Sequence, residues 1–249
     1  MSRHFRLAVA TLGGRELVRF WRERARVAGF VGSPLLFWLI IGSGFSDLAF
    51  FFPGAVTLTV MVSATFSTMS LIEDRREGFL LSMLVSPAPR SAMVLGKVLG
   101  SSTLAWLQGL VLLTFLPLAG LRPPAVSIVG AALVIYLVSF AFTALGFLIA
   151  WHMESSQGFH AVMNLVLFPL WMVSGALFSP SSAHEWMQLV MRWNPLTYSL
   201  AALRRLLEPA PDPATPALAE SVLVTAACAV TLIVLATQAA RRQPKRSYA

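Results

Sequence analysis

The chain has 249 residues, of which 57% are hydrophobic and only 12% are charged. An ordinary soluble domain carries about a quarter of its residues as Asp, Glu, Lys or Arg, so this composition excludes a soluble globular protein and indicates a lipid bilayer as the surrounding solvent. The formal net charge of +8 comes from basic residues that gather in a few clusters between apolar runs. That arrangement is typical of a membrane protein and argues against a nucleic-acid-binding surface.

The first 26 residues carry seven arginines and no uninterrupted apolar run, so we expect no cleaved signal peptide. Residues 15–26 place four arginines on one helical face and three bulky apolar side chains on another: Arg15, Arg19, Arg22 and Arg26 against Leu17, Phe20 and Trp21. This pattern predicts an amphipathic helix that lies in the headgroup layer with its arginines on lipid phosphates. The alternative is a set of flanking charges that only fix the topology.

Six stretches are long and apolar enough to cross a bilayer as helices, for which about 20 residues are needed. In chain order they are Val27–Phe45, Leu48–Ile72, Val98–Leu121, Ala125–Trp151, Phe159–Phe178 and Ser221–Ala240. The runs are continuous and do not alternate, which argues against a transmembrane β-barrel. The sequence therefore predicts an all-α integral membrane protein with six transmembrane helices.

The orientation follows from the basic residues. With six spans, both termini lie on one side of the membrane, and the segments of that side hold 15 Lys and Arg against 4 on the other. Because loops rich in Lys and Arg stay in the cytoplasm, we expect both termini to be cytoplasmic.

The cytoplasmic loop Glu73–Lys97 contains a short apolar segment between two helix breakers. Gly78 can end a helix and Pro87 prevents another from running through, so Phe79–Val85 is predicted as about two turns of helix. Such a helix can dock a partner protein or fold back on its own protein, and the sequence leaves both open.

The outer segment Ser179–Ala217 is too apolar for water and too short for a full span. Its first part carries four apolar side chains on one helical stripe: Trp186, Leu189, Val190 and Trp193. The dipeptide Asn194-Pro195 breaks that helix. We expect two short re-entrant helices joined at this break, which form either a movable plug near the outer exit or a static interfacial cap. The Pro-rich stretch Glu208–Pro216 is predicted to be a stiff exposed connector.

Motifs for chemistry are missing from the sequence. Gly96-Lys97 lacks the remaining residues of a phosphate-binding loop, and His184-Glu185 is an isolated pair instead of a zinc-binding helix motif. We therefore predict no catalytic, metal or nucleotide-binding site and no cofactor in this chain. The predicted spans also lack charged residues apart from Glu220 at the edge of the sixth, which disfavours a proton- or ion-coupled carrier. Energy for transport would then come from outside the chain, and the apolar wall fits a hydrophobic or amphipathic cargo.

Two blocks of sequence carry a resemblance to a known family. The first comprises Glu73-Asp74-Arg75-Arg76-Glu77-Gly78, Leu84-Val85-Ser86-Pro87 and Leu95-Gly96-Lys97. The second comprises Phe168-Pro169-Leu170-Trp171, Ser174-Gly175-Ala176-Leu177-Phe178, Asn194-Pro195-Leu196-Thr197-Tyr198 and Leu203-Arg204. In their order and spacing, and in the six-helix layout, the chain resembles the type-2 ATP-binding-cassette (ABC-2) exporter permeases over essentially its whole length.

The resemblance implies one transmembrane domain over residues 1–249, with a cytosolic or interfacial helix at 1–26, five spans within 27–178, an outer re-entrant segment at 179–217, and the last span with a basic tail at 218–249. It implies that the chain pairs with a second copy of itself or a similar permease, and with ABC ATPase subunits that bind ATP and Mg. We expect membrane lipids to surround it in the bacterial plasma (inner) membrane, and we expect no nucleic-acid partner. The family's cargoes include drugs, lipids and lipid-linked saccharides.

The resemblance also implies two groups of functional residues. Contact with the ATPase falls to the N-terminal helix and to the loop after the second span, which here supply Arg19, Arg22, Glu73, Asp74, Arg75, Glu77, Gly78 and Pro87. The outer gate or re-entrant segment supplies Gly175, Trp186, Trp193, Asn194 and Pro195. Two other classes stay open here: an integral-membrane enzyme that modifies lipid, with His184, Glu185 and Arg192 as its only polar candidates at one leaflet, and a non-transporting scaffold subunit.

Overall fold

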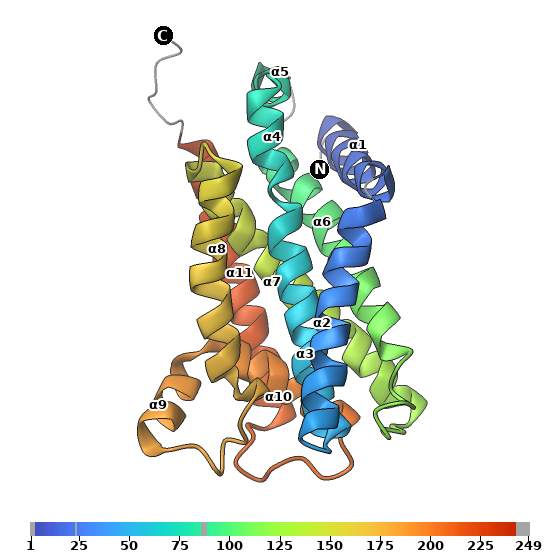
Figure 1. Ribbon diagram of the computed structural model, residues 1–249. Coiled ribbons are helices and arrows are strands. Elements are labelled where there is room, and N and C mark those ends of the chain that lie inside the picture. The colour runs from blue at the N-terminus through green and yellow to red at the C-terminus, as the bar shows by residue number, and fades with distance from the viewer. Residues whose placement is uncertain (1–2, 23, 86–88, 243–249) are drawn as a thin grey trace.

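The structure is a computed structural model that describes residues 3–22, 24–85 and 89–242. Its elements in chain order are α1 (Arg3–Arg22), α2 (Arg24–Gly44), α3 (Leu48–Ser67), α4 (Ser70–Arg76), α5 (Phe79–Val85), α6 (Arg90–Leu113), α7 (Ala125–His152), α8 (Ser156–Trp171), the π-helical turn η1 (Met172–Ala176), α9 (Glu185–Trp193), α10 (Pro195–Leu207) and α11 (Leu218–Arg241). The long helices form a bundle that has α1, α4 and α5 at one end and α9 and α10 at the other (Figure 1). We call these the α5 end and the α9 end.

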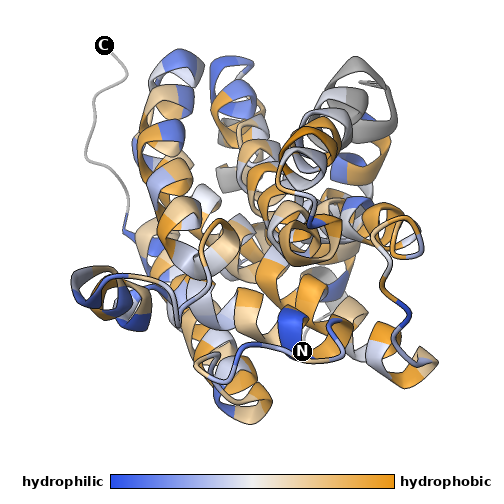
Figure 2. Ribbon diagram, turned by 60° about the horizontal axis from the view of Figure 1, so that its bottom comes forward, coloured by the Kyte–Doolittle hydropathy of each residue, from blue (hydrophilic) through white to orange (hydrophobic). Residues whose placement is uncertain are grey.

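Five stretches in the described part of the chain are helical, long and apolar enough to cross a membrane. They are Leu48–Arg76, Arg90–Leu113, Ala125–His152, Ser156–Ala176 and Leu218–Arg241. These stretches confirm five of the six predicted spans. The first predicted span, Val27–Phe45, coincides with α2, whose described apolar part is the shorter Gly32–Gly44. Figure 2 shows these long helices coloured mainly as hydrophobic, with hydrophilic residues toward helix ends and connections.

Helix α3 is the centre of the bundle and packs against α2, α6, α7, α8 and α10. Almost every side chain from Phe51 to Phe66 is buried, as expected for a helix that is apolar on all sides. Two buried tryptophans fasten neighbouring helices to it. The indole of Trp38 on α2 donates to the carbonyl of Leu48 at 2.8 Å, and that of Trp171 on α8 donates to the carbonyl of Gly54 at 2.9 Å.

The third predicted span is wrong in its bounds, because α6 begins at Arg90 and ends at Leu113 instead of covering Val98–Leu121. Lys97 therefore lies inside the helix and is only 3% exposed. Its charge is neutralised by carboxylates from two other helices, so the helix can run through it. Helix α6 ends before Pro117, whose ring would clash with the carbonyl of Leu113 in a continued helix.

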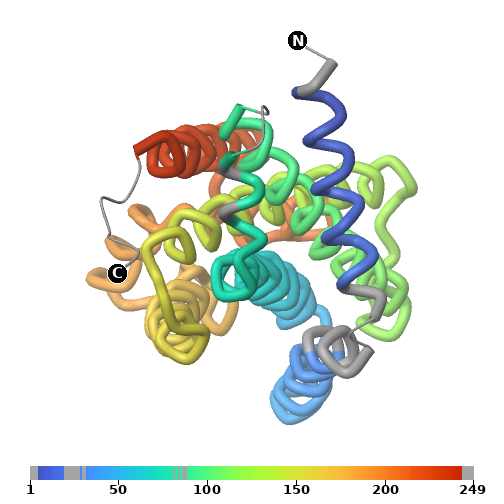
Figure 3. The backbone as a smooth tube through the Cα atoms, turned by 90° about the horizontal axis from the view of Figure 1, so that it is seen from above, coloured from blue at the N-terminus to red at the C-terminus, as the bar shows by residue number. Residues whose placement is uncertain are grey.

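The N-terminal helix also differs from the prediction over residues 15–26. Helix α1 begins at Arg3 and ends at Arg22, and it extends across the α5 end of the bundle instead of along it (Figure 3). Arg15 and Arg19 face α4 and make ion pairs there, so they are not free to bind lipid phosphates as the sequence pattern suggested.

The outer segment forms the two short helices that the sequence predicts, α9 and α10, joined at Asn194-Pro195. Asn194 caps α10 by accepting from the backbone of Leu196 at 2.9 Å, and Pro195 occupies the first helical turn. The side chain of Asn194 also donates to the carbonyl of Leu170 at 2.7 Å. The break between the helices is thereby fixed to the end of α8.

Candidate functional site

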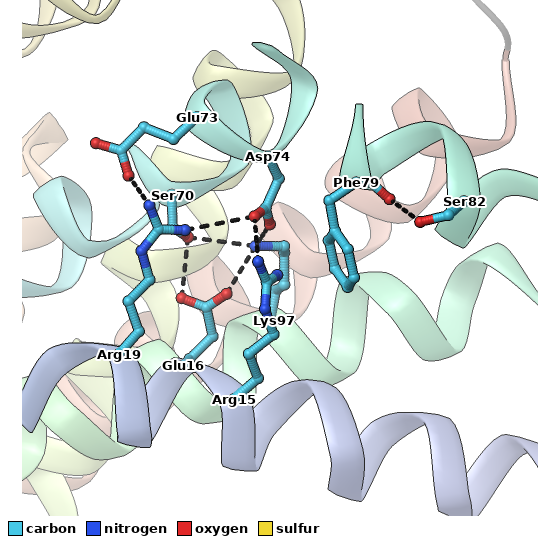
Figure 4. A network of polar contacts seen from close by, with 9 residues as sticks. All are labelled: Arg15, Glu16, Arg19, Ser70, Glu73, Asp74, Phe79, Ser82 and Lys97. Atoms are coloured by element: carbon cyan, nitrogen blue, oxygen red, sulfur yellow. Dashed lines mark hydrogen bonds and ion pairs between the residues drawn. The ribbon is translucent and has the colours of Figure 1, made fainter. Parts of the chain in front are cut away.

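A cluster of charged side chains lies where α1, α4 and α6 meet at the α5 end (Figure 4). We call it the ionic cluster, and its members are Arg15, Glu16 and Arg19 of α1, Glu73 and Asp74 of α4, and Lys97 of α6. The three cations balance the three anions, so the cluster is neutral as a whole.

Lys97 is the centre of the ionic cluster. Its Nζ lies 2.7 Å from Glu16 Oε1, 2.6 Å from Asp74 Oδ2 and 3.2 Å from Ser70 Oγ. Ser70 in turn donates to Glu16 Oε2 at 2.9 Å. The three charged side chains are each at most 5% exposed, and charges so deeply buried are tolerated only when they are paired. Each polar hydrogen of the ammonium group thus faces an oxygen atom.

Asp74 uses its other carboxylate oxygen for the arginines of α1. Asp74 Oδ1 accepts from Arg15 Nη2 at 2.9 Å and from Arg19 Nη1 at 3.4 Å. Arg19 also pairs with Glu73. A single buried carboxylate on α4 therefore binds both α6 and α1.

The ionic cluster reaches α5 through Arg15, whose guanidinium carbon lies 3.7 Å from the ring centroid of Phe79, the first residue of α5. This distance is a cation–π contact. Helix α5 begins and ends as predicted. The predicted helix stop at Gly78 is also confirmed, because that residue has a φ of +76°, which favours glycine.

Three glycines allow α1 and α6 to approach closely enough for these contacts. A Cβ atom added at Gly100 would lie 2.8 Å from the carbonyl oxygen of Gly13, and one added at Gly96 would lie 3.0 Å from the Cβ of Leu12. Gly96 and Gly100 have the four-residue spacing by which small residues let membrane helices pack closely. Lys97 lies between them, so this spacing is a sequence signal for a close helix contact around Lys97, although it does not identify Glu16 as the partner.

The predicted ATPase-coupling residues are only partly brought together. Arg19, Glu73 and Asp74 belong to the ionic cluster, whereas Arg75 donates to the carbonyls of Trp151 and Met153, at 2.7 Å each, and so binds the connection between α7 and α8. Glu77 is exposed next to Gly78. The predictions for Pro87 and for the side chain of Arg22 lie outside the described residues.

Sequence reasoning missed Glu16 and Lys97. It took Glu16 as part of a basic amphipathic helix and Lys97 as a loop residue, although the two form a buried ion pair in which neither side chain is more than 5% exposed.

At the α9 end, the structure contains a second buried charged group, on Arg204, that the sequence reasoning did not single out. Arg204 of α10 is 4% exposed and donates to the carbonyl of Gly175 at 3.0 Å and to Glu208 at 3.0 Å. Its guanidinium carbon lies 4.1 Å from the ring centroid of Phe50, at the start of α3. Gly175 has a φ of +93° where the helix breaks. Arg204 therefore holds α10, η1 and α3 together.

Of the predicted outer residues, Gly175, Asn194 and Pro195 lie at the junction of η1, α8 and α10. Trp186 and Trp193 do not: their side chains are 58% and 83% exposed. The stripe on α9 is thus not covered by the described part of the chain.

The connector after α10 is less exposed than predicted, because Asp212 binds the beginning of the outer segment. It accepts from the hydroxyls of Ser179 and Ser181 and from the backbone of Ser181. Although burial opposes ionisation of this carboxyl, these hydrogen bonds lower the pKa of Asp212 to about 2. Arg205 further donates to the carbonyls of Thr215 and Pro216.

Comparison with known proteins gives a family match. The family described as ABC-2 type transporter matches residues 8–207. The chain is 29% identical over 225 residues to the daunorubicin resistance ABC transporter permease protein DrrB1 of Streptomyces coeruleorubidus, which covers 81% of this chain and 78% of that protein. It is 27% identical over 209 residues to nodulation protein J of Rhizobium leguminosarum bv. trifolii (75% and 76%), and 26% identical over 206 residues to ycf38 of Cyanophora paradoxa (77% and 71%).

Proposed function

The chain belongs to the ABC-2 type transporter family, and from this premise we propose that it moves a hydrophobic or amphipathic molecule outward across the membrane. It is a multi-pass permease subunit without an ATPase domain, and membership of the family implies an ATP-binding partner subunit. In this proposal α2 is the first of six spans and completes the five found in the described part of the chain. Both termini are cytoplasmic, and the membrane is a bacterial plasma (inner) membrane. ATP and Mg are bound by the partner alone.

The single observation that carries the coupling part of the proposal is the construction of the α5 end. Helix α5 protrudes there beside α1 (Figure 1), and Val85 at its end is 84% exposed. Its first residue, Phe79, is held by Arg15 and hence by the ionic cluster. Because contacts fix the first residue of this projecting helix, a displacement of α5 by a docked ATPase would also displace α1, α4 and α6. We assign Glu77, at the exposed base of α5, to this docking surface.

The choice of cargo class rests on the polar side chains of the central helices. Thr57, Thr59 and Thr65 of α3 each donate to a carbonyl one turn earlier in their own helix, at 2.8–3.0 Å. Ser139 and Thr143 of α7 do the same. These hydroxyls are thereby satisfied within the helix, so they offer a passing molecule little polar lining. An apolar wall favours a cargo with a large hydrophobic part over a small ion.

We propose a second permease subunit and membrane lipids as the cover for the exposed apolar surface. On α8, Leu165 is 76% and Phe168 is 51% exposed, and the α9 stripe ends in the exposed Trp193. Tryptophan is enriched at the membrane interface. In this proposal a second copy of the chain or a similar permease covers the exposed residues of α8. The lipids of the outer leaflet cover the stripe on α9.

For the outer gate, we propose that the junction of Gly175, Asn194 and Pro195 is its hinge. Cysteine replacements of Trp186 and Trp193 would report the movement of α9 through the rate of thiol labelling from outside, with and without a vanadate-trapped ATPase. A difference between the two states supports a gate, whereas equal rates support a static cap.

The proposed function is tested by expressing the chain together with an ABC ATPase subunit encoded beside its gene. The purified complex in nanodiscs of phosphatidylethanolamine and phosphatidylglycerol is assayed for ATP hydrolysis with daunorubicin as an amphipathic probe, and with sodium and potassium ions as non-amphipathic controls. We expect the two subunits to co-purify and the amphipathic probe alone to change the rate. A chain that purifies without any ATPase subunit contradicts the proposal.

A further inference from the structure

We propose that Lys97 is a positioning residue that makes α1, α4 and α6 one rigid unit and thereby fixes the direction in which α5 projects. The inference deepens the proposed function, because the unit is what a docked ATPase would move. It rests on three features of the ionic cluster: the number of helices that meet at Lys97, the charge left when Lys97 is removed, and the chain of contacts from Lys97 to α5.

The first feature is the geometry at the Lys97 ammonium. Its partners come from two other helices, with Glu16 on α1 and both Ser70 and Asp74 on α4. The Lys97 nitrogen atom therefore connects α1 to α4, because Glu16 of α1 and Asp74 of α4 both contact it. The close approach of α1 and α6 at Gly100 leaves little space around it. A compact ammonium group fits this position, whereas a planar guanidinium would need acceptors in one plane and more room.

The second feature is the charge balance. Without Lys97, the carboxylates of Glu16 and Asp74 would remain 5% and 0% exposed with no cation between them. The two carboxylates would repel each other and the cluster would keep one uncompensated negative charge, which strains the contact of α1 with α4 that Arg15 and Arg19 still make. If Glu16 is neutralised as well, the cluster is balanced again, because Asp74 keeps Arg15 and Arg19. In that double variant the repulsion is gone, but so are the ion pairs of α6 with α1 and α4, which leaves the glycine contacts between α1 and α6 without them.

The third feature is the path to α5. Lys97 holds Asp74 Oδ2, which leaves Oδ1 directed at Arg15. The guanidinium of Arg15 then covers the ring of Phe79. Three successive contacts therefore connect the interior of the bundle with the first residue of α5 (Figure 4).

The test measures the position of α5 relative to α1 in the full chain without an ATPase. Spin labels are attached to cysteines that replace Leu7 on α1 and Val85 on α5, which are 54% and 84% exposed, in a Cys228→Ala background in nanodiscs of phosphatidylethanolamine and phosphatidylglycerol. A second pair at Leu133 and Leu223, both exposed on α7 and α11 away from the cluster, reports the integrity of the bundle.

The variants are Lys97→Met, Lys97→Arg and the neutral double variant Glu16→Gln/Lys97→Met. The matched control is Gln108→Met, since Gln108 is also a buried polar residue of α6, and its side-chain amide has no hydrogen-bond partner among the described residues. We expect the unsubstituted chain and Gln108→Met to give one narrow Leu7–Val85 distance peak. All three Lys97 variants should lose that peak while the Leu133–Leu223 distance stays unchanged.

The double variant is decisive, because it removes the repulsion that could prevent Lys97→Met from folding. A narrow Leu7–Val85 peak in the double variant overturns the inference, and so does a change of the Leu133–Leu223 distance in it, which would make Lys97 a general packing residue. Neither result affects the proposed function, which falls instead if no ATPase subunit binds the unsubstituted chain.

Discussion

The close approach of α1 and α6 makes Gly100→Ala a severe test of the site as described. The new Cβ would lie 2.8 Å from the carbonyl oxygen of Gly13, 2.9 Å from its Cα and 3.0 Å from the Cβ of Glu16. Two of these three atoms are backbone, so a side-chain rotation cannot relieve the clash. Because carbon contacts are comfortable only at about 3.5 Å or more, α1 must move away by roughly 0.7 Å.

That movement determines the size of the effect. The 2.7 Å contact between Lys97 and Glu16 would lengthen to about 3.4 Å, which is beyond a good charge-assisted hydrogen bond. Overpacking of this kind costs about 1–3 kcal/mol. With about 2–4 °C for each kcal/mol in a chain of this size, we expect the unfolding midpoint of Gly100→Ala to fall by several degrees.

The assay is thermal unfolding in nanodiscs followed by tryptophan fluorescence, with Gly14→Ala as the matched control. Gly14 lies next to Gly13 on α1, and a Cβ added there has no atom within 4 Å. Alanine is also a better helix former than glycine by about 0.5–1 kcal/mol, so this variant should be as stable as the parent or slightly more stable. A Gly100→Ala chain that unfolds at or above the temperature of the Gly14→Ala chain would refute the close approach of the two helices.

Other predictions concern both ends of the bundle. Arg204→Met leaves the carboxyl of Glu208 without its ion pair and should lower the free energy of unfolding by about 3–5 kcal/mol. Thermal unfolding measures this against the exposed control Arg192→Met, and equal midpoints would contradict the role given to Arg204. Glu77→Arg should reduce co-purification of the ATPase without lowering the unfolding midpoint, and unchanged complex formation would remove Glu77 from the docking surface. Asp212→Asn should speed amide exchange of Ser181, whose N–H donates to Asp212. Because the pKa of Asp212 is lowered to about 2 from its usual 3.8, its contribution is complete at pH above about 4 and is lost as the pH falls through about 2; loss of Ser181 protection already at pH 5 would contradict this assignment.

Much of the fold could be predicted because the signals are local. Apolar length identifies the spans, and the breakers Gly78 and Pro195 place the short helices α5 and α10 at their observed positions. The start of α6 could not be read in this way. Lys97 is a charge that local reasoning moves out of a membrane helix, and one of the two carboxylates that neutralise it, on Glu16, is 81 residues away. A pairing over that separation depends on tertiary packing and leaves no periodic pattern.

The role of Arg204 could not be identified from the sequence for a related reason. In the count of basic residues it is one of four on the outer side, and in the family resemblance it is only the end of the block Leu203-Arg204. In the structure it is buried, and its partners are a carboxylate one turn later and the carbonyl of a glycine in the left-handed region. The pairing with Glu208 has the readable spacing of four residues, but the carbonyl of Gly175 becomes available only because η1 interrupts the helix. A break in backbone hydrogen bonding thus creates an acceptor that sequence composition cannot reveal.

The two buried charge sites belong to one mechanical element. Asp74, in the ionic cluster, lies at the end of α4, while Phe50, under Arg204, lies at the beginning of α3, and α3 and α4 follow each other with only Thr68 and Met69 between them. Along this path α3 is buried on all sides and is bound to α2 and α8 through the indoles of Trp38 and Trp171. Close-packed interiors transmit displacement instead of absorbing it. A displacement of α4 at the α5 end has to cross only the two-residue turn before it enters the buried α3 and reaches the Arg204 contacts, so the two charge sites are expected to respond together.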